Sequence, residues 1–185
     1  MDKINFFPEN LNIQNQKIIL RLDLNVPLKD KIIQDDTRIS LCLPFIKKLV
    51  EKKAKIVIVS HLGRPKGTKV PELSLIPVYK YLKKSIRTNV YFFMGNLDDE
   101  VQDKFSHLKE GEIILLENIR YFKEESSNDE NFSKRLGSLG DIYINDAFSC
   151  SHRKQASIHN ITKFIKHSYA GPLLKKEIEA INLVI

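Results

Sequence analysis

The sequence lacks several features that would place it in a specialised class of proteins. It has no tryptophan, two cysteines in 185 residues, and only seven glycines and seven prolines. Cys42 and Cys150 cannot form the disulfide framework of a small secreted domain, and so little glycine and proline excludes collagen-like and low-complexity chains. Residues 1–16 are polar and do not resemble a secretion signal. No run approaches the roughly 18 apolar residues of a membrane span. We therefore expect a cytoplasmic protein that does not bind a membrane.

What is present fits a soluble globular domain with an anionic ligand. Hydrophobic residues make up 42% and charged residues 29%, and the net charge is +7. A positive balance suggests nucleic acid, an acidic surface or a small phosphorylated ligand. A nucleic-acid binder would need a basic stripe interleaved with exposed aromatics, but the ten phenylalanines lie mostly in apolar runs. We therefore expect no nucleic-acid partner.

Hydrophobic patterning predicts an α/β fold. Short apolar runs typical of buried strands alternate with longer segments of helical spacing. The strands are expected at 17–22, 56–59, 90–93, 112–116 and 141–144, and the helices at 44–53, 75–82, 97–108, 129–139 and 172–185, with a small hairpin at 29–34. This alternation indicates βαβ units. It predicts a three-layer, Rossmann-like domain with a mainly parallel sheet and helices on both faces.

Several details of this pattern concern where helices begin. Helical spacing starts at Thr37, but proline is poorly tolerated inside a helix. We therefore expect the regular helix to begin at Pro44 and Arg38 to lie in a preceding turn. Ser74 is expected to cap the second helix, and Asn128 or Asp129 to start the fourth. Residues 157–166 give no clear pattern.

Polar residues suited to ligand binding follow four of the five strands. In parallel sheets, ligands bind beyond the carboxyl ends of the strands. The four clusters are Asp23-Leu24-Asn25, Ser60–Pro65 (SHLGRP), Glu117–Tyr121 (ENIRY) and Asn145–Arg153 (NDAFSCSHR). Each alone is compatible with an ordinary turn or surface loop, but four such coincidences are improbable. Arginine presents a planar fork that grips phosphate or carboxylate, so convergence of Arg64, Arg120 and Arg153 would make a pocket for a small polyanion. Arg38 is a further candidate for this pocket, with pairing to Asp35 or Asp36 as the alternative.

Other chemistries fit the sequence less well. Gly63–Thr68 has three residues between its glycines, whereas a P-loop needs four followed by lysine. No cysteine and histidine set has zinc spacing, so no metal site is expected. An acidic cluster is expected to form a solvated face: Glu124, Glu125, Asp129 and Glu130.

The clusters, in this order and spacing, resemble those of the phosphoglycerate kinase family. The similarity runs essentially from end to end. The matching segments are Arg21–Pro27 (RLDLNVP), Asp35–Arg38 (DDTR), Leu43-Pro44, Ser60–Gly67 (SHLGRPKG), Leu115–Tyr121 (LLENIRY), Tyr143–Phe148 (YINDAF), His152-Arg153 and Ala170–Ile178 (AGPLLKKEI). The combination of SHLGRPKG, LLEN-x-R and NDAF is highly specific.

The resemblance implies an enzyme of glycolysis and its reverse, a usually monomeric kinase with two Rossmann-like lobes. Such enzymes transfer a phosphoryl group between 1,3-bisphosphoglycerate and ADP, giving 3-phosphoglycerate and ATP with Mg²⁺. By motif, Asp23 and Asn25, with Leu24 between them, would bind the glycerate portion. Arg38 would stabilise the transferring phosphoryl group as the catalytic residue. The far phosphate would be held by His61, Arg64, Arg120 and Arg153, with Leu62 and Gly63 completing the loop.

Two departures from the family pattern concern this chain. After NDAF the family usually reads Gly-Thr-Ala-His-Arg-Ala-His, whereas here the residues are Ser149-Cys150-Ser151-His152-Arg153-Lys154-Gln155. The family's chains are also about twice as long. We therefore expect residues 1–170 to form the phosphoglycerate-binding N-terminal domain and 171–185 to begin a truncated interdomain helix. The C-terminal domain that binds ATP, ADP and Mg²⁺ is expected to be absent, so that the chain is inactive alone. The alternative is a stand-alone binding module for a phosphorylated metabolite.

Overall fold

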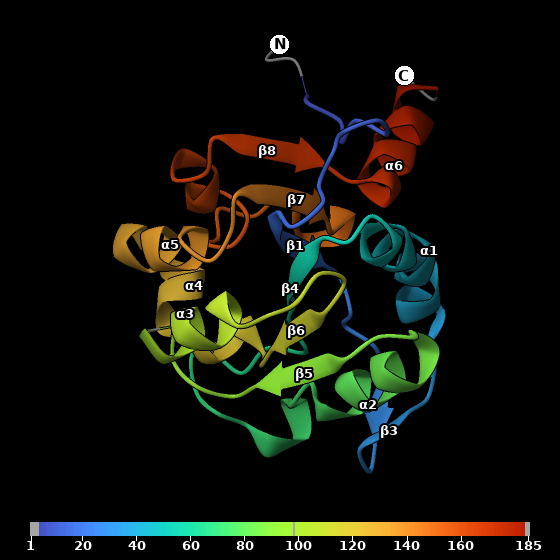
Figure 1. Cartoon of the computed structure of the whole chain (residues 1–185). Helices are drawn as coiled ribbons and strands as arrows, with labels where there is room; N and C mark the ends of the chain where they lie inside the picture. The colour runs from blue at the N-terminus through green and yellow to red at the C-terminus, as the bar shows by residue number, and fades with distance from the viewer. Residues whose placement is uncertain (1–3, 98, 184–185) are drawn as a thin grey trace.

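A parallel sheet forms the middle of three layers in the computed structural model, which describes residues 4–97 and 99–183 (Figure 1). Within those residues the sheet has six strands in the order β5-β6-β4-β1-β7-β8. Their bounds are β1 Lys17–Leu22, β4 Lys55–Val59, β5 Val90–Phe93, β6 Ile113–Leu116, β7 Ile142–Asp146 and β8 His167–Ala170. A separate antiparallel hairpin joins β2 (Leu28–Lys29) to β3 (Ile32–Ile33). The predicted fold class is confirmed, as are the five expected strands to within two residues.

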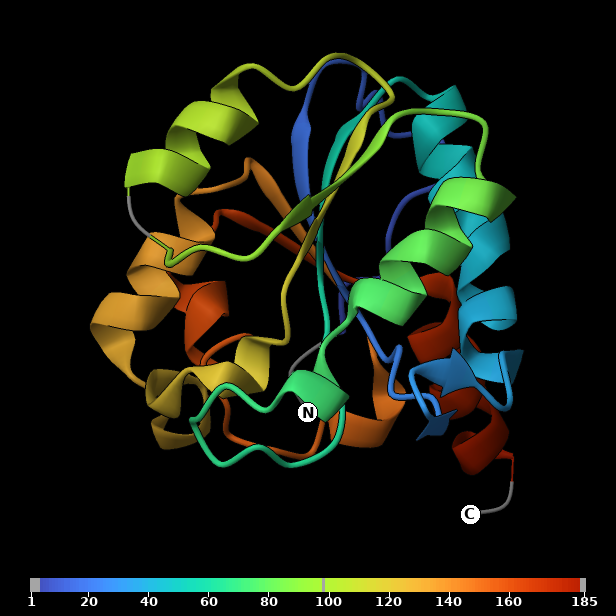
Figure 2. The same ribbon diagram turned by 90° about the horizontal axis from the view of Figure 1, so that it is seen from below.

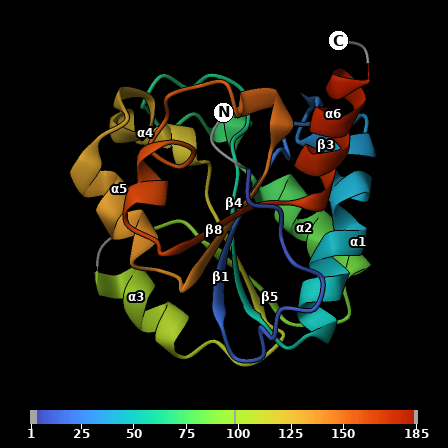
Figure 3. The same ribbon diagram turned by 90° about the horizontal axis from the view of Figure 1, so that it is seen from above.

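Helices cover both faces of the sheet (Figures 2 and 3). Seen along the sheet, α1, α2 and α6 lie on one side, and α3, α4 and α5 lie on the other (Figure 3). The helices are α1 Thr37–Glu51, α2 Ile76–Ser85, α3 Asp99–Ser106, α4 Lys123–Ser127, α5 Glu130–Gly137 and α6 Pro172–Asn182. Alternate residues of each strand therefore enter different cores: Ile18, Leu20 and Leu22 pack with α1, while Ile19 packs toward α5.

The start of α1 differs from the sequence prediction. The helix begins at Thr37, so that Pro44 lies inside it and Arg38 is in its first turn. Pro44 is exposed and Ser40, whose carbonyl loses its helical partner, is exposed as well. Water can satisfy that carbonyl on the solvent side. The opposite face of α1 buries Ile39, Cys42, Phe45, Ile46 and Leu49, and this packing outweighs the lost hydrogen bond.

Other boundaries also differ from the pattern. The second helix starts at Ile76 with Leu75 as its N-cap residue, one residue later than predicted, although the Ser74 hydroxyl does accept a hydrogen bond from the Ile76 amide at 3.2 Å. The short helix α4 was not expected, and Asn128 ends it in a left-handed conformation with a φ of 55°. Asp129 caps α5 through the Phe132 amide. Residues 160–163 form a 3₁₀ turn. The edge strand β8 was missed because His167 and Ser168 break its apolar pattern.

The first turn of α6 is held by a buried carboxylate. Asp146, at the end of β7, accepts a hydrogen bond from the Leu174 amide at 2.9 Å and is only 3% exposed. Gly171 lies so close that an added Cβ would be 2.4 Å from the Asp146 carboxyl carbon. Burial raises the pKa of Asp146 to about 6. Residues 184–185 of the helix predicted from 172 lie outside the described part of the chain.

Asp146 is expected to make stability depend on pH. Because its folded pKa is raised, its contribution to stability is complete below the unfolded pKa of 3.8 and is lost as the pH rises through about 6. Asp146→Asn removes the charge and keeps an acceptor for Leu174. We expect the variant to gain about 3 kcal/mol relative to the natural chain between pH 4 and pH 6. Urea unfolding at a series of pH values measures this, with the exposed Asp103→Asn as control. A pH-independent difference would contradict it.

Candidate functional site

A cavity of about 230 Å³ lies where the polar clusters meet. Pockets that enclose drug-sized ligands are typically about 300–1,000 Å³, so this cavity suits a smaller molecule. Four guanidinium groups surround it, and none of its lining residues is acidic. The lining residues are Asn25, Arg38, His61, Gly63, Arg64, Arg120, Ser149, Cys150 and Arg153.

Sheet topology explains why these residues converge. The clusters follow β1, β4, β6 and β7, which are the four central strands of the sheet. All four are parallel and in register, with Arg21 beside Val59 on one side and Asn145 on the other. Their carboxyl ends therefore meet at one edge. The third predicted strand, β5, carries no such cluster, and it lies at the far edge of the sheet.

The loop after β4 is shaped by Asn118 and Asn25. The Asn118 side chain accepts from the Leu62 amide at 3.2 Å and donates to the Leu62 carbonyl at 2.7 Å. The Asn25 carboxamide oxygen accepts from the Gly63 amide at 2.8 Å. Gly63 has a φ of +60°, and an added Cβ would lie 2.6 Å from a Leu73 methyl group. Hydrogen bonds from the segments after β1 and β6 therefore hold the loop after β4 that contains Gly63.

Gly63→Ala is expected to lower the unfolding free energy by about 1–3 kcal/mol and to weaken anion binding. The left-handed backbone strains any residue with a Cβ, and the Leu73 side chain must move. Gly111→Ala is the matched control, because Gly111 also has a positive φ of 78° but follows α3, away from the cavity. Urea unfolding and ligand calorimetry measure both effects. Equal loss of affinity in the two variants would contradict the account.

His61 is a neutral hydrogen-bond donor toward the cavity. It is 4% exposed, and burial, followed by the charges of Arg21 and Arg120, lowers its pKa to about 3. Its Nδ1 lies 3.1 Å from Arg21 Nη2. A guanidinium only donates hydrogen bonds, so Nδ1 accepts and the proton resides on Nε2. His61 therefore offers an N–H group to a ligand without adding positive charge.

Arg21 belongs to a buried network beneath the cavity. Its Nε donates to the Ser157 hydroxyl at 3.0 Å, and that hydroxyl donates to Glu125 Oε1 at 2.6 Å. The Ser157 amide donates to Glu125 Oε2 at 2.8 Å. Both Arg21 and Glu125 are fully buried. The predicted solvated acidic face is therefore wrong for Glu125, which lies inside α4 and compensates the charge of Arg21.

Arg120 forms one wall of the cavity. Its side chain is 8% exposed, and its Nη1 donates to the Gly63 carbonyl at 2.9 Å. The Asn118 carboxamide oxygen accepts from its backbone amide at 3.1 Å. Burial lowers the pKa of Arg120, and the charges of Arg21 and Arg153 add to this effect. Such mutual repulsion among neighbouring cations is relieved when an anion binds between them.

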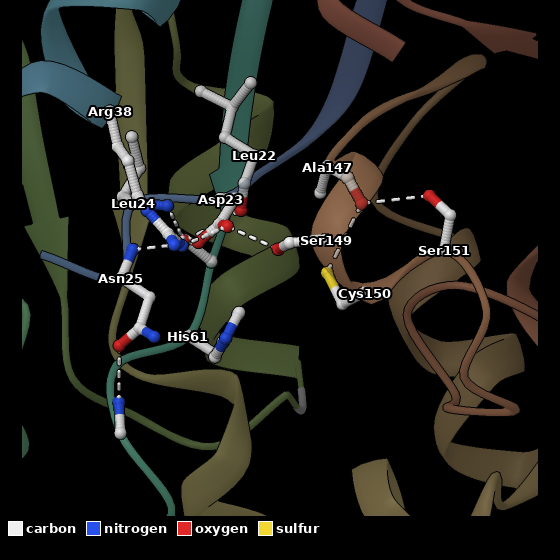
Figure 4. Close-up of polar contacts among 12 residues, drawn as sticks. Leu22, Asp23, Leu24, Asn25, Arg38, His61, Ala147, Ser149, Cys150 and Ser151 are labelled. Atoms are coloured by element: carbon white, nitrogen blue, oxygen red, sulfur yellow. Dashed lines mark hydrogen bonds and ion pairs between the residues drawn. The ribbon is translucent and has the colours of Figure 1, made fainter. Parts of the chain in front are cut away.

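Asp23 lies beside the cavity rather than in its lining. Arg38 and Ser149 both donate to Asp23 Oδ2, and the Asn25 amide donates to Oδ1 at 3.0 Å (Figure 4). Burial raises the pKa of Asp23, but the hydrogen bonds from Ser149, Asn25 and Arg38 outweigh burial and lower it overall. Asp23 is therefore an ionised acceptor at the rim.

The remaining predicted site residues fall into two groups. Arg64 and Arg153 are exposed and line the cavity, so all four arginines singled out in the sequence converge there. Leu24 and Leu62 are buried in the core instead. Their backbone amides donate to Ser60 and Asn118, respectively, and their side chains do not line the cavity.

Sequence reasoning did not select three residues that belong to the site. Ser149 and Cys150 line the cavity, and Arg21 supports His61 from below. The position of Ser149 and Cys150 directly after NDAF was a signal that could have identified them. An arginine inside an otherwise apolar strand was the corresponding signal for Arg21, because a buried charge requires partners.

Elsewhere in the described part of the chain, we looked for a second anion-binding cavity, a metal site and a membrane-spanning helix. A larger cavity of about 590 Å³ is lined by residues that include Leu28 and Tyr121, but its basic residues are lysines and it has Glu72 and Glu117 in its wall. Among the residues described, no cluster of three or more histidine, cysteine, aspartate or glutamate side chains is arranged to hold a metal ion. None of the helices described has the length and apolar character to cross a membrane.

Comparison with known proteins gives a consistent result. Residues 9–185 match the family model described as phosphoglycerate kinase. The phosphoglycerate kinase of Dictyoglomus turgidum is 46% identical over 91% of this chain and 42% of its own length. That of Wolbachia pipientis wMel is 47% identical over 96% of this chain and 44% of its own. The solved structure of phosphoglycerate kinase from Coxiella burnetii has a TM-score of 0.86 and 40% identity, covering 95% of this chain and 44% of that one. The chain therefore spans less than half the length of these relatives.

Proposed function

The chain belongs to the phosphoglycerate kinase family, and on that premise we propose that it forms the phosphoglycerate-binding half of such an enzyme. The cavity of four guanidinium groups would receive the phosphate of 3-phosphoglycerate or 1,3-bisphosphoglycerate. The single observation that carries this proposal is the convergence of Arg38, Arg64, Arg120 and Arg153 on one small cavity without an acidic wall. The matched relatives are named kinases, which favours this function over a stand-alone binding module.

Within the site, each group would have a separate task. Arg64, Arg120 and Arg153 would hold the phosphate distant from the reacting carboxyl group, and His61 would add its Nε2–H donor. Asp23 and the Asn25 carboxamide would contact the glycerate portion. Arg38, in contact with Asp23 at the rim, would lie closest to the carboxyl end and the transferring phosphoryl group. Leu24, Leu62 and Gly63 would serve through their backbone.

The reaction we propose for the complete enzyme is phosphoryl transfer between an acyl phosphate and ADP. The bond between phosphorus and the carboxyl oxygen breaks, the phosphoryl group passes to ADP, and the carboxylate of 3-phosphoglycerate remains. Positioning and charge neutralisation supply most of the catalysis in such transfers. The arginines of this chain would supply both toward the phosphoglycerate.

The nucleotide and its Mg²⁺ do not fit the described residues of this chain. Hard cations require oxygen ligands. None of the residues that line the cavity is acidic, and Asp23 beside it already accepts from Arg38 and Ser149. We assign nucleotide and metal binding to the part of the relatives that this chain does not match. Residues 1–170 would then form the N-terminal domain and 171–185 the start of the helix leading to the second. A cytoplasmic, monomeric enzyme with no nucleic-acid partner stays a prediction.

Isothermal titration calorimetry with 3-phosphoglycerate and with ATP tests the proposed function. We expect 3-phosphoglycerate to bind weakly to the 185-residue chain, and ATP to give no comparable signal. Affinity should fall as salt is added, because the contacts are charged. Phosphotransfer by this chain alone is not expected. Tight ATP binding without any signal from 3-phosphoglycerate would refute the proposal.

A further inference from the structure

Ser149 links two loops of the site that come from neighbouring strands. It lies in a 3₁₀ turn, Phe148–Cys150, that follows β7, whereas Asp23 follows β1. The turn is closed by hydrogen bonds from the Cys150 amide to the Ala147 carbonyl at 3.3 Å and from the Ser151 amide to the Phe148 carbonyl at 3.0 Å. Cys150 is buried and anchors the turn. The exposed Ser149 hydroxyl is thus presented to Asp23 from a fixed backbone.

The acceptor capacity of Asp23 is nearly filled on one side. A carboxylate has about four lone-pair positions, two on each oxygen. Oδ2 receives both Arg38 and Ser149, whereas Oδ1 receives the Asn25 amide alone (Figure 4). The position that remains is on Oδ1. A ligand hydroxyl would therefore be directed to Oδ1.

We propose that Ser149 is a positioning residue that holds the Asp23 carboxylate so that Oδ1 receives the hydroxyl of the bound ligand. This inference rests on the proposed function and adds to it a residue, Ser149, that lines the cavity. Ser149 acts through Asp23 and does not itself contact the hydroxyl.

The charged groups around Asp23 come from several elements. Arg38 approaches from α1 and His61 from the loop after β4. The negative charge of Asp23 also contributes, after burial and Asp146, to raising the pKa of the Cys42 thiol on α1. His61 is neutral above about pH 3, so Arg38 is the cation in direct contact. Among the hydrogen bonds to Asp23, that of Ser149 contributes most to lowering its pKa, against the opposing effect of burial.

The first test is an NMR titration of the Asp23 carboxyl carbon in the 185-residue chain. Ser149→Ala should move the Asp23 pKa upward, while Ser149→Thr, which keeps the hydroxyl, should leave it in place. Ser151→Ala is the matched control, because Ser151 lies in the same loop and donates to the Ala147 carbonyl instead. An unchanged pKa in Ser149→Ala would overturn the proposal.

The second test is calorimetry with 3-phosphoglycerate and with 3-phosphooxypropanoate, which lacks the hydroxyl. Ser149→Ala should weaken binding of 3-phosphoglycerate about three- to tenfold and leave the affinity for the deoxy analogue unchanged. Equal losses for both ligands would overturn the proposal. If the natural chain bound neither ligand, the proposed function would fail, and the Asp23 titration would still decide whether Ser149 holds the carboxylate.

Discussion

Replacement of Arg120 by alanine is expected to weaken binding of 3-phosphoglycerate about a hundredfold, the largest effect on affinity of any single change in the cavity. Arg120 is buried in the wall, and its fork is already oriented by the hydrogen bond to the Gly63 carbonyl. Hydrogen bonds to charged groups contribute about 1.5–3 kcal/mol each. A pre-oriented guanidinium loses little entropy when it binds phosphate.

Arg120→Lys separates charge from geometry. A lysine keeps the positive charge but cannot make two parallel hydrogen bonds, so we expect about a tenfold loss. Arg87→Ala and Arg135→Ala serve as controls, because both arginines are exposed and neither lines the cavity. Calorimetry at constant ionic strength measures the affinities. Affinity unchanged in Arg120→Ala would contradict the assignment of this residue to phosphate binding.

Arg21→Met is expected to lower the unfolding free energy by about 3 kcal/mol at pH 7, the largest loss of stability expected for a single substitution. The substitution leaves Glu125 fully buried without the cation that most offsets its burial. Arg21 and Glu125 are joined through the Ser157 hydroxyl, and leaving a buried charge without its compensating partner typically costs about 3–5 kcal/mol. Burial raises the pKa of Glu125, and Arg21 opposes that rise. Without Arg21, folding favours the protonated carboxyl, so the loss of stability should shrink as the pH is lowered.

A second substitution distinguishes the charge from the loss of packing. Glu125→Gln in the Arg21→Met background removes the uncompensated charge and should restore part of the stability. Urea unfolding of the single and double variants at pH 7 and pH 5 gives the comparison. Arg87→Met, at an exposed position, should leave stability nearly unchanged. A double variant no more stable than Arg21→Met would show that the buried charge is not responsible.

The sheet could be predicted because its strands are buried on both faces. Such strands appear as continuous apolar runs, as in Ile113–Leu116. The edge strand β8 is only partly covered, so His167 and Ser168 are tolerated there and the pattern disappears. Pro44 misled the prediction of α1 because its local cost is outweighed by burial of residues such as Phe45 and Ile46. Tertiary packing, which spacing alone does not reveal, decided both cases.

The cavity could be predicted in outline because parallel strands bring their carboxyl ends together. Arg64 and Arg120 are 56 positions apart in the chain, and the order of the strands brings both to the cavity. The supporting contacts could not be predicted. Nothing in the local sequence says that Arg21 meets Ser157, 136 positions away, or that Ser149 reaches Asp23. These contacts depend on the register of β1 with β7.

The arginine side chains themselves provide the most direct test. In an NMR titration of the 185-residue chain with 3-phosphoglycerate, the guanidinium N–H signals of Arg38, Arg64, Arg120 and Arg153 should shift together and saturate with one binding constant. Those of Arg87 and Arg135 should not move. If the four signals stay unchanged while signals around the 590 Å³ cavity near Tyr121 shift, the phosphate binds elsewhere and the assignment of this cavity is wrong.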